Sequence, residues 1–410
     1  MNDTSPAAAA DPVALDDTAI EALRARTPGT RTTVHFNHAG SSLPSVDTLE
    51  TMRKQLWREA EMGPIEAGAA ARDLGEQARL LAATLLNARP AEIALTTGNS
   101  IGWGSAFAAL GNWQTGDRIL VARHEWGGNI AAMHVAAVRH GARIEAIPSD
   151  DTGMADPRAL EAMIDERVRL VCVTWLPANG GLINPAAAIG AVARRHGIPY
   201  FVDAAQAVGQ LPIDVNEVGC DVLTGVGRKA LRGPRETGLL YIRQDFLPRL
   251  TPALADTNTA PLDEHGVPVM RTDAARFEPS ERSYVLRCGL ANALREALDI
   301  GIGNIRTRVD RNARSLRGLL ADIPGVEVLD QGRERSGLVS FTLAGRDAGT
   351  LMRELAGKGI SISANGPAYT PLDMRARGLA EIARASVSYL TTDDEMDRLA
   401  ETIRALGRAA

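Results

Sequence analysis

The sequence predicts an α/β protein with two domains, the larger of which is built on a mostly parallel β-sheet. The chain has 410 residues, 45% of them hydrophobic, and this length exceeds what one compact core usually contains. Between about residues 60 and 250, short continuous apolar runs alternate with helical patterns. Such runs are typical of parallel strands that helices cover on both faces. A second alternation after residue 286 predicts a smaller C-terminal α/β domain.

Residues 1–17 are small and polar and predict a loose tail. Residues 45–90 have a helical pattern that begins with Ser45 as N-cap. Strands of the larger domain are predicted at DRILVAR, RLVCVTWLP, IPYFVDAA, CDVLTGVG and GLLYIR, and helices at NIAAMHVAAVRHGA and PAAAIGAVARRHG. Residues 251–285 are irregular, and a long helix from about residue 286 precedes strands at VEVLD, GLVSFTLA, ISISA and ARASVSYL.

Composition and charge argue against several classes of protein. The formal net charge of −5 does not suit a general nucleic-acid binder, which is usually basic. The cysteines Cys172, Cys220 and Cys288 are scattered and odd in number, so they form no disulfide framework. No segment has the pattern of a signal peptide or of a membrane span. We therefore expect a cytoplasmic protein that binds neither nucleic acid nor membrane, and we predict no metal site.

Polar residues stand where predicted strands end, which is where open α/β sheets bind their ligands. In TTGNSIGWGSAF, Asn99 and Ser100 open a helix whose free N–H groups suit a phosphate, although a plain helix cap fits the same residues. Asp203 ends the strand of IPYFVDAA. A buried carboxylate there is costly without a partner, and the alternative is that Asp203 caps the next helix.

Lys229 is one of only three lysines, with Lys54 and Lys358, among 45 basic residues. The other two have ordinary explanations on a polar helix face and at a helix end. A Schiff base is the chemical role in which arginine cannot replace lysine. Trp126, in HEWGGN, lies at a strand end, where its ring either joins the core or stacks on a flat cofactor. A phosphate cradle, a flat ring, a buried carboxylate and a lysine are what a pyridoxal 5′-phosphate (PLP) site needs.

Seven segments carry a resemblance to a known family: FNHAGSSLPS, LTTGNS, HEWGGN, LPANGGLINP, VDAAQAVGQLPIDV, GCDVLTGVGRKALRGPRETGLLYI and ARASVSYLTTDDEMDRL. Over about residues 34–405 the chain resembles the class V aminotransferase (cysteine desulfurase-like) family of fold-type I PLP-dependent enzymes. It is most similar to the branch of C–S lyases and isopenicillin N epimerase-like proteins. The resemblance implies a sheet of the seven-stranded type in the large domain and PLP as the cofactor.

The resemblance also implies a role for each matching residue. Lys229 would form the Schiff base with the cofactor and move the Cα proton, and Asp203 would pair with the pyridinium nitrogen. Arg384 would bind the substrate α-carboxylate, a bidentate task that suits arginine. The remaining matches would contact the phosphate (Asn99, Ser100), the face of the ring (Trp126) and the ring hydroxyl or the substrate (Gln206, Asn179).

Two departures from the family pattern bear on function. Relatives often read Ser-Gly-His-Lys at the lysine, whereas this chain has Val226 and Arg228 in place of the serine and the histidine. Arg228 either supplies a cation for the phosphate or points to solvent. Residues 363–378 contain no cysteine, which a cysteine desulfurase needs as its nucleophile. The three cysteines are interpreted as structural, so persulfide chemistry is not expected.

Four more residues are predicted near the substrate, with a structural turn as the alternative for each. They are His38, Ser41, Ser42 and Tyr369. The favoured reaction is β-elimination that cleaves a C–S bond of an S-substituted cysteine, in a secondary-metabolite or thiol pathway. An aminotransferase or an epimerase of the same family is the alternative, and a non-catalytic PLP-fold binding protein is an alternative of another class.

By the same resemblance the protein is expected to be a homodimer with shared active sites. Residues 233–238 and 277–283 are the expected cross-subunit segments, with Arg235 and Ser280 as candidate contacts. After the tail, residues 18–59 are predicted to pack on the small domain or on the partner subunit. Residues 60–285 would form the large PLP-binding domain, and residues 286–410 the small C-terminal domain.

Overall fold

A seven-stranded sheet forms the centre of the large domain in the computed structural model, which describes residues 15–408. The strand order is β2-β8-β7-β6-β5-β3-β4, and only β8 runs antiparallel to its neighbours. The predicted α/β fold with a mostly parallel sheet is confirmed. The strands are β2 (Ile93–Thr96), β3 (Arg118–Ala122), β4 (Arg143–Ile147), β5 (Val168–Thr174), β6 (Tyr200–Asp203), β7 (Val222–Val226) and β8 (Gly238–Ile242).

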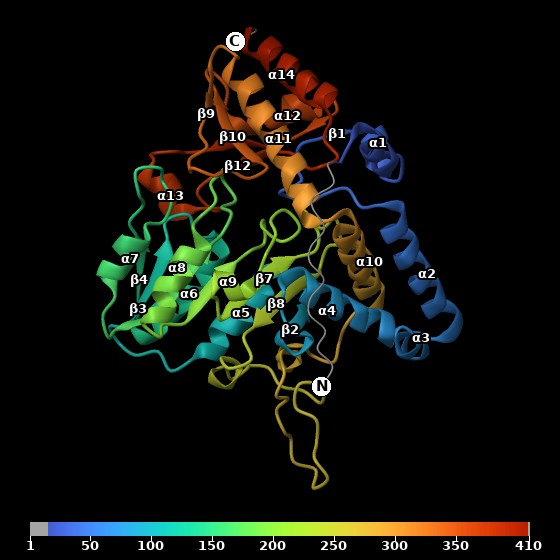
Figure 1. Cartoon of the computed structure of the whole chain (residues 1–410), viewed down its shortest axis with the longest axis vertical. Coiled ribbons are helices and arrows are strands. Elements are labelled where there is room, and N and C mark those ends of the chain that lie inside the picture. The colour runs from blue at the N-terminus through green and yellow to red at the C-terminus, as the bar shows by residue number, and fades with distance from the viewer. Residues whose placement is uncertain (1–14, 409–410) are drawn as a thin grey trace.

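Helices cover both faces of this sheet (Figure 1). Alternate side chains of β3 enter two separate apolar cores, Leu120 and Ala122 on one face and Ile119 and Val121 on the other. This two-sided burial explains the continuous apolar runs in the sequence. The covering helices are α4 (Arg72–Leu86), α5 (Asn99–Leu110), α6 (Gly127–His140), α7 (Pro157–Met163), α8 (Ala186–Arg195) and α9 (Val215–Val218).

The N-terminal segment runs along the outside of both domains. Helix α1 (Asp17–Ala25) has Asp16 as its N-cap, whose side chain accepts from the Ala19 N–H, so residues 16 and 17 belong to the start of a helix. The rest of the predicted tail, residues 1–14, lies outside the described part of the chain. The predicted N-cap Ser45 is confirmed, because its hydroxyl accepts from the Thr48 N–H. The segment continues with the 3-10 turn Pro28–Arg31 and the helices α2 (Val46–Met62) and α3 (Pro64–Ala70).

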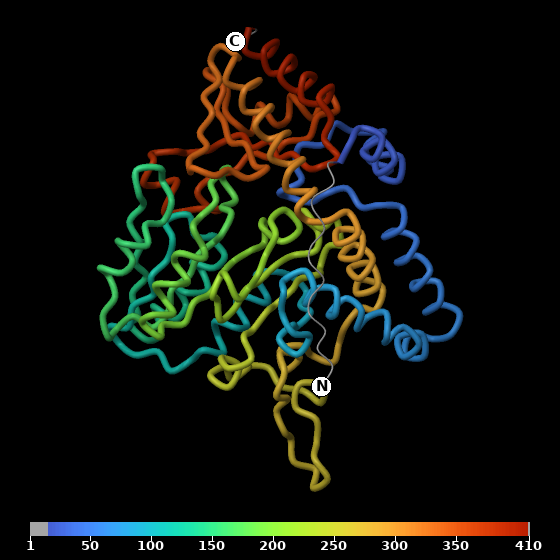
Figure 2. Tube along the Cα trace, viewed as in Figure 1, coloured from blue at the N-terminus to red at the C-terminus, as the bar shows by residue number. Residues whose placement is uncertain are grey.

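The C-terminal part contains a four-stranded antiparallel sheet with the order β12-β13-β10-β9. Beside it, β1 (Val34–His35) pairs in parallel with β11 (Ile360–Ser361), so residues from the two ends of the chain lie together (Figure 2). The strands of the larger sheet are β9 (Val326–Val328), β10 (Leu338–Leu343), β12 (Ser363–Asn365) and β13 (Ile382–Ser386). The helices are α11 (Ile302–Ala321), α12 (Ala348–Ala356), α13 (Pro371–Ala376) and α14 (Asp393–Arg408).

The long helix predicted from residue 286 begins at α10 (Tyr284–Ile300) and continues after Gly301 as α11. Helix α10 packs against α4 and α2 (Figure 1), so it lies with the large domain, although the predicted boundary at residue 286 assigns most of this helix to the small domain. The division of the chain at residue 286 remains a prediction. No helix within residues 15–408 is long and apolar enough to cross a membrane.

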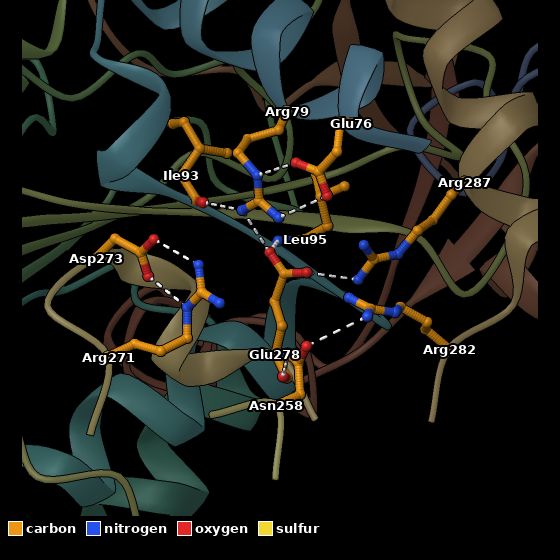
Figure 3. Close-up of polar contacts among 10 residues, drawn as sticks. All are labelled: Glu76, Arg79, Ile93, Leu95, Asn258, Arg271, Asp273, Glu278, Arg282 and Arg287. Atoms are coloured by element: carbon orange, nitrogen blue, oxygen red, sulfur yellow. Dashed lines mark hydrogen bonds and ion pairs between the residues drawn. The ribbon is translucent and has the colours of Figure 1, made fainter. Parts of the chain in front are cut away.

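Residues 251–285 are predicted to be irregular. Up to residue 283, where α10 follows, this segment contains only one short 3-10 turn, Ala274–Phe277, and part of it projects from the body (Figure 1). A buried ion cluster holds the end of this segment (Figure 3). Glu278 accepts from the Leu95 N–H at 2.7 Å and pairs with Arg79 and Arg287, both at 2.6 Å. Arg79 also donates to the Ile93 carbonyl. The free edge of β2 is therefore satisfied by side chains. Two other 3-10 turns are Pro90–Glu92 and Leu247–Arg249.

Candidate active site

A cavity of about 690 Å³ opens at the carboxyl ends of the large-domain strands. Its wall combines loops that follow β2, β3, β6 and β7 with the extended residues 35–41 and with three side chains from the small domain. Those three are Ser363, Tyr369 and Arg384. The cavity therefore lies between the two predicted domains and is completed by the N-terminal segment.

Lys229 follows β7 and lines this cavity. Burial, aided by the neighbouring Arg228 and Arg384 and opposed by Asp203, lowers the pKa of its amine to about 7. Desolvation and like charges both disfavour the protonated form of a lysine. The amine is therefore largely unprotonated slightly above neutral pH, the form a nucleophile or base requires.

Asp203 is the last residue of β6 and lies in the cavity floor with 2% of its surface exposed. Its Oδ2 accepts from the side-chain amides of Asn99 and Asn129, each at 2.9 Å. Its Oδ1 accepts from the Ala205 N–H at 3.0 Å within a turn. No helix begins there, because the next helix, α9, has Asp214 as its N-cap, so the alternative that Asp203 caps a helix is wrong. Three N–H donors compensate the buried carboxylate and fix its orientation toward the cavity.

Glu125 is a buried acid beside Asp203 that the sequence analysis missed. It directly follows the loop after β3, with no exposed surface. Burial, and then the Asp203 charge, raise the pKa of Glu125 to about 8. The available signal was the spacing of Glu125 and Asn129, four residues apart and therefore on one face of the start of a helix. The motif HEWGGN drew attention to Trp126 instead.

Helix α5 begins beside Lys229 and directs its first N–H groups toward the cavity, which Asn99 and Ser100 line. Gly238, at the start of β8, lies directly against this turn, because a Cβ there would be 2.7 Å from the Gly98 carbonyl carbon. The side chain of Asn99 donates to Asp203 rather than projecting as a free phosphate ligand, because the buried carboxylate needs the donor. The phosphate contact predicted for Asn99 stays a prediction.

Trp126 is the N-cap residue of α6, and its ring faces the cavity. The Trp126 N–H donates to the Thr174 hydroxyl at 2.9 Å. The ring lies over Gly128, where a Cβ would be 2.4 Å from the indole Nε1. The Tyr369 ring stands edge-on to it, with centroids 5.5 Å apart, and the Tyr369 carbonyl accepts from the Gly127 N–H. The small-domain residue Tyr369 is thus held against the start of α6.

Arg384, on β13, points into the cavity with 3% of its surface exposed. It donates to the Ala178 carbonyl at 2.7 Å and to the Asn37 side chain at 3.2 Å. Its Nε has no hydrogen-bond partner among residues 15–408, and burial lowers its pKa to about 10. A buried guanidinium with an unused donor is well suited to bind an anion in the cavity.

Gln206 and Ser41 also line the cavity as predicted. The Gln206 side chain donates to the Ala39 carbonyl at 3.0 Å and so holds the N-terminal segment against the loop after β6. The Ser41 hydroxyl donates to the Arg228 carbonyl at 3.4 Å. Both residues therefore line the cavity and also link the N-terminal segment to the loops of the large domain.

Three predicted site residues, Asn179, His38 and Ser42, lie outside the cavity lining. The Asn179 amide donates to the Gly366 carbonyl and to the Thr370 hydroxyl. These bonds link the large domain to the small-domain segment that carries Tyr369. His38 turns away from the cavity and contacts the Ser42 hydroxyl at 3.0 Å. Its neighbour His35 lines the cavity instead. The contacts predicted for Asn179 with the cofactor or the substrate, and for His38 with the substrate, stay predictions.

Arg228 lines the cavity next to Lys229, so it does not simply point to solvent. Burial and the neighbouring Arg235 lower its pKa, and no carboxylate among residues 15–408 pairs with it. Val226 lines the cavity where relatives often have a hydroxyl. An unpaired guanidinium beside a helix start gives this part of the cavity a strong attraction for a doubly charged anion.

All three cysteines are buried, and none of them lines the cavity. Burial raises the pKa of Cys172 and of Cys220, and it raises the pKa of Cys288 to about 11. These thiols are therefore protonated and poorly nucleophilic at neutral pH.

The family model "Aminotransferase class-V" matches residues 34–399. A "Probable cysteine desulfurase" of Xylella fastidiosa (strain 9a5c) is 30% identical over 336 residues, covering 81% of this chain and 80% of that protein.

Two solved structures of C-DES, a cystine C–S lyase, are each 26% identical to this chain. The complex of the lyase with its product cysteine persulfide has a TM-score of 0.84 and covers 92% of this chain and 99% of that one. A lysine-to-alanine variant with glycine covalently linked to its PLP cofactor has a TM-score of 0.85, with coverages of 93% and 98%.

Proposed function

Because the chain belongs to the class V aminotransferase family and is a PLP-dependent enzyme, we propose that it cleaves the C–S bond of an S-substituted cysteine by β-elimination. One observation carries the choice of reaction. The cavity contains a lysine, a carboxylate and an arginine suited to an amino acid, yet no cysteine among residues 15–408 lines it. A desulfurase that transfers sulfur to its own thiol requires such a cysteine, whereas an elimination does not.

The residues of the cavity fit PLP. The unused Nε of Arg384, the unpaired Arg228 and the oriented Asp203 carboxylate are polar groups that await charged partners. We propose that Asp203 pairs with the ring nitrogen, that Lys229 binds the aldehyde carbon, and that Trp126 and Gln206 contact the ring. The start of α5, Ser100 and Arg228 would hold the phosphate. When bound, PLP withdraws electrons from the Cα of the attached amino acid.

The other groups act on the substrate. Arg384 binds the α-carboxylate through its free donors and so orients the Cα–H bond. Once the substrate amine has displaced Lys229 from the cofactor, the freed Lys229 amine, whose pKa is about 7, would accept the Cα proton. The Cβ–S bond then breaks, and its electron pair leaves with the sulfur. With one water, the substituted cysteine yields a thiol, pyruvate and ammonia.

An assay of pyruvate and thiol release from S-substituted cysteines tests this proposal. We expect equal amounts of both products, over many turnovers, and none from Lys229→Ala. Stoichiometric conversion of the cofactor to its amine form without pyruvate would instead establish an aminotransferase. Inversion at Cα without release of thiol would establish an epimerase.

We also propose that a second copy of the chain covers the outer face of α2 and α3. This face carries large exposed apolar side chains, among them Trp57 at 63% and Ile65 at 81% exposure. Such a patch is unusual on a monomer. Ile101, at the rim of the cavity, is also apolar and exposed. The partner's segment 277–283 is the part expected to complete the cavity.

A further inference from the structure

Two buried carboxyl groups share one amide beneath the cavity. The Asn129 Nδ2 donates to Glu125 Oε1 at 2.7 Å and to Asp203 Oδ2 at 2.9 Å. An amide nitrogen has two hydrogens, so each carboxyl group receives one of them. Asn129 is itself buried, with 1% of its surface exposed. Its orientation is therefore set by the two acids between which it lies.

Glu125 is also anchored on its other side. Its Oε2 accepts from the Thr174 N–H at 2.8 Å, at the end of β5. The Thr174 hydroxyl in turn accepts from the Trp126 N–H. Glu125 thus joins the end of β5 and the start of α6, and through Asn129 it reaches the end of β6. A rigid link of this kind fixes the position of whatever Asn129 holds.

Burying Glu125 as a second acid beside Asp203 costs free energy of desolvation, which an apolar side chain at this position would avoid. The groups that face Glu125 are Asp203 and Tyr200 on β6 and Cys172 on β5, and no cation lies among them. Two adjacent buried carboxylates do not both ionise readily. Glu125 is therefore the neutral member of the pair at physiological pH, in agreement with its raised pKa of about 8.

We propose that Glu125 is a positioning residue that, through Asn129, holds the Asp203 carboxylate in place for the cofactor ring. This inference rests on the cofactor role proposed above for Asp203. It assigns no contact between Glu125 and the substrate or the cofactor. Its effect is transmitted through the two hydrogen bonds of Asn129.

The test compares Glu125→Ala and Glu125→Gln with the wild-type holoenzyme and apoenzyme. We measure the PLP dissociation constant of the apoenzyme, and the pH midpoint of the change in the visible absorption of the resting holoenzyme. Glu125→Ala frees Asn129, so we expect about a 10-fold or greater loss of PLP affinity, the usual effect of losing support for a charged hydrogen bond. We also expect its absorption midpoint to move.

Glu125→Gln keeps the size of the side chain and one acceptor but cannot ionise. The wild-type absorption should therefore show an alkaline step near pH 8 that is absent in Glu125→Gln. This second variant decides the question if Glu125→Ala does not fold. The matched control is Glu92→Gln, which alters another buried carboxyl group of the large domain that accepts from the Gln244 N–H far from the cavity lining. It should lower thermal stability and leave both readouts unchanged.

The outcomes separate this inference from its premise. If Asp203→Asn leaves the affinity and the absorption midpoint unchanged, the role proposed for Asp203 is wrong. If Asp203→Asn shifts both values, while both Glu125 variants lower only the melting temperature, Glu125 is merely a structural residue and the inference is overturned. The inference is supported if Glu125→Ala loses PLP affinity and Glu125→Gln loses the alkaline step, while Asp203→Asn shifts both values.

Discussion

Lys229 is reactive only as a free amine, and the cavity favours that form. Burial lowers its pKa from the ordinary value of 10.5 to about 7. Because a lowered pKa releases the proton at lower pH, we expect the rate of PLP incorporation into the apoenzyme to rise through pH 7 and to level off above pH 8. Rapid-mixing absorbance measurements at a series of pH values would show this. A rate that keeps rising to pH 10 would contradict the low pKa.

Arg228 offers a second prediction for a single residue. If its unpaired guanidinium holds the phosphate, Arg228→Ala should weaken PLP binding about 10- to 100-fold, the range for a hydrogen bond between charged groups. Equilibrium titration of the apoenzyme with PLP measures the change. Arg194→Ala, which removes a surface arginine that donates to the Asn216 carbonyl, is the control and should bind normally. If Arg228→Ala and the wild type bind PLP with equal affinity, Arg228 does not hold the phosphate, and it binds either the substrate or no ligand.

Much of the candidate site was predictable from residue type and place in the sequence. Lys229, Asp203 and Arg384 each belong to a strand end or a strand, and the structure brings all three to one cavity. The contacts that were not foreseen have a common physical origin. The contacts of Asn179 and Asn99 depend on partners distant in sequence, Thr370 and Asp203. A single sequence does not say which of several possible partners a polar side chain will meet.

Among the elements, the irregular segment before α10 depends most on one side chain. Glu278 is fully buried and pairs with Arg79 and Arg287, which are also largely buried. Glu278→Gln leaves two buried cations without their counter-charge. We expect the free energy of unfolding to fall by about 3–5 kcal/mol, the usual effect of breaking a buried ion pair. Urea unfolding of the apoenzyme measures the loss.

The control for this variant is Glu161→Gln, which removes an exposed carboxylate that pairs with Arg195 at the surface. Surface ion pairs add little to stability, so the control should unfold like the wild type. An unchanged midpoint for Glu278→Gln would mean that the two arginines find other partners or solvent.

At the level of elements, the predicted strands of the large domain were found because β-runs buried on both faces are strongly apolar. Two features were not predictable in this way. The reversed direction of β8 is not visible in its composition, because β8 is as apolar as the strands of the sheet that run parallel to one another. The strand β1 has only two residues, and its partner β11 lies near the other end of the chain.

For the whole molecule, the proposed dimer makes a direct prediction. Trp57→Asp combined with Ile65→Asp places two charges on the exposed apolar face of α2 and α3. Each large apolar side chain contributes about 1.5–3 kcal/mol when buried, so the pair should raise the dimer dissociation constant by about 100-fold or more. Sedimentation at several protein concentrations would measure it.

Val138→Asp is the control for the dimer, since Val138 is similarly exposed at 71% but lies on α6. It should leave the association unchanged. A wild-type protein that sediments as a monomer at all concentrations would exclude the proposed interface, and so would equal effects of the two changes.

The pairing of β1 with β11 has a consequence for the order of events during synthesis. Residues 35–41 form part of the cavity wall, yet the strand that anchors them is translated near the end of the chain. A ribosome-bound chain that has completed the large domain therefore still has an open wall and lacks Arg384. We expect nascent chains stalled before residue 360 to retain PLP weakly, and tight retention to begin only once the last strands have emerged.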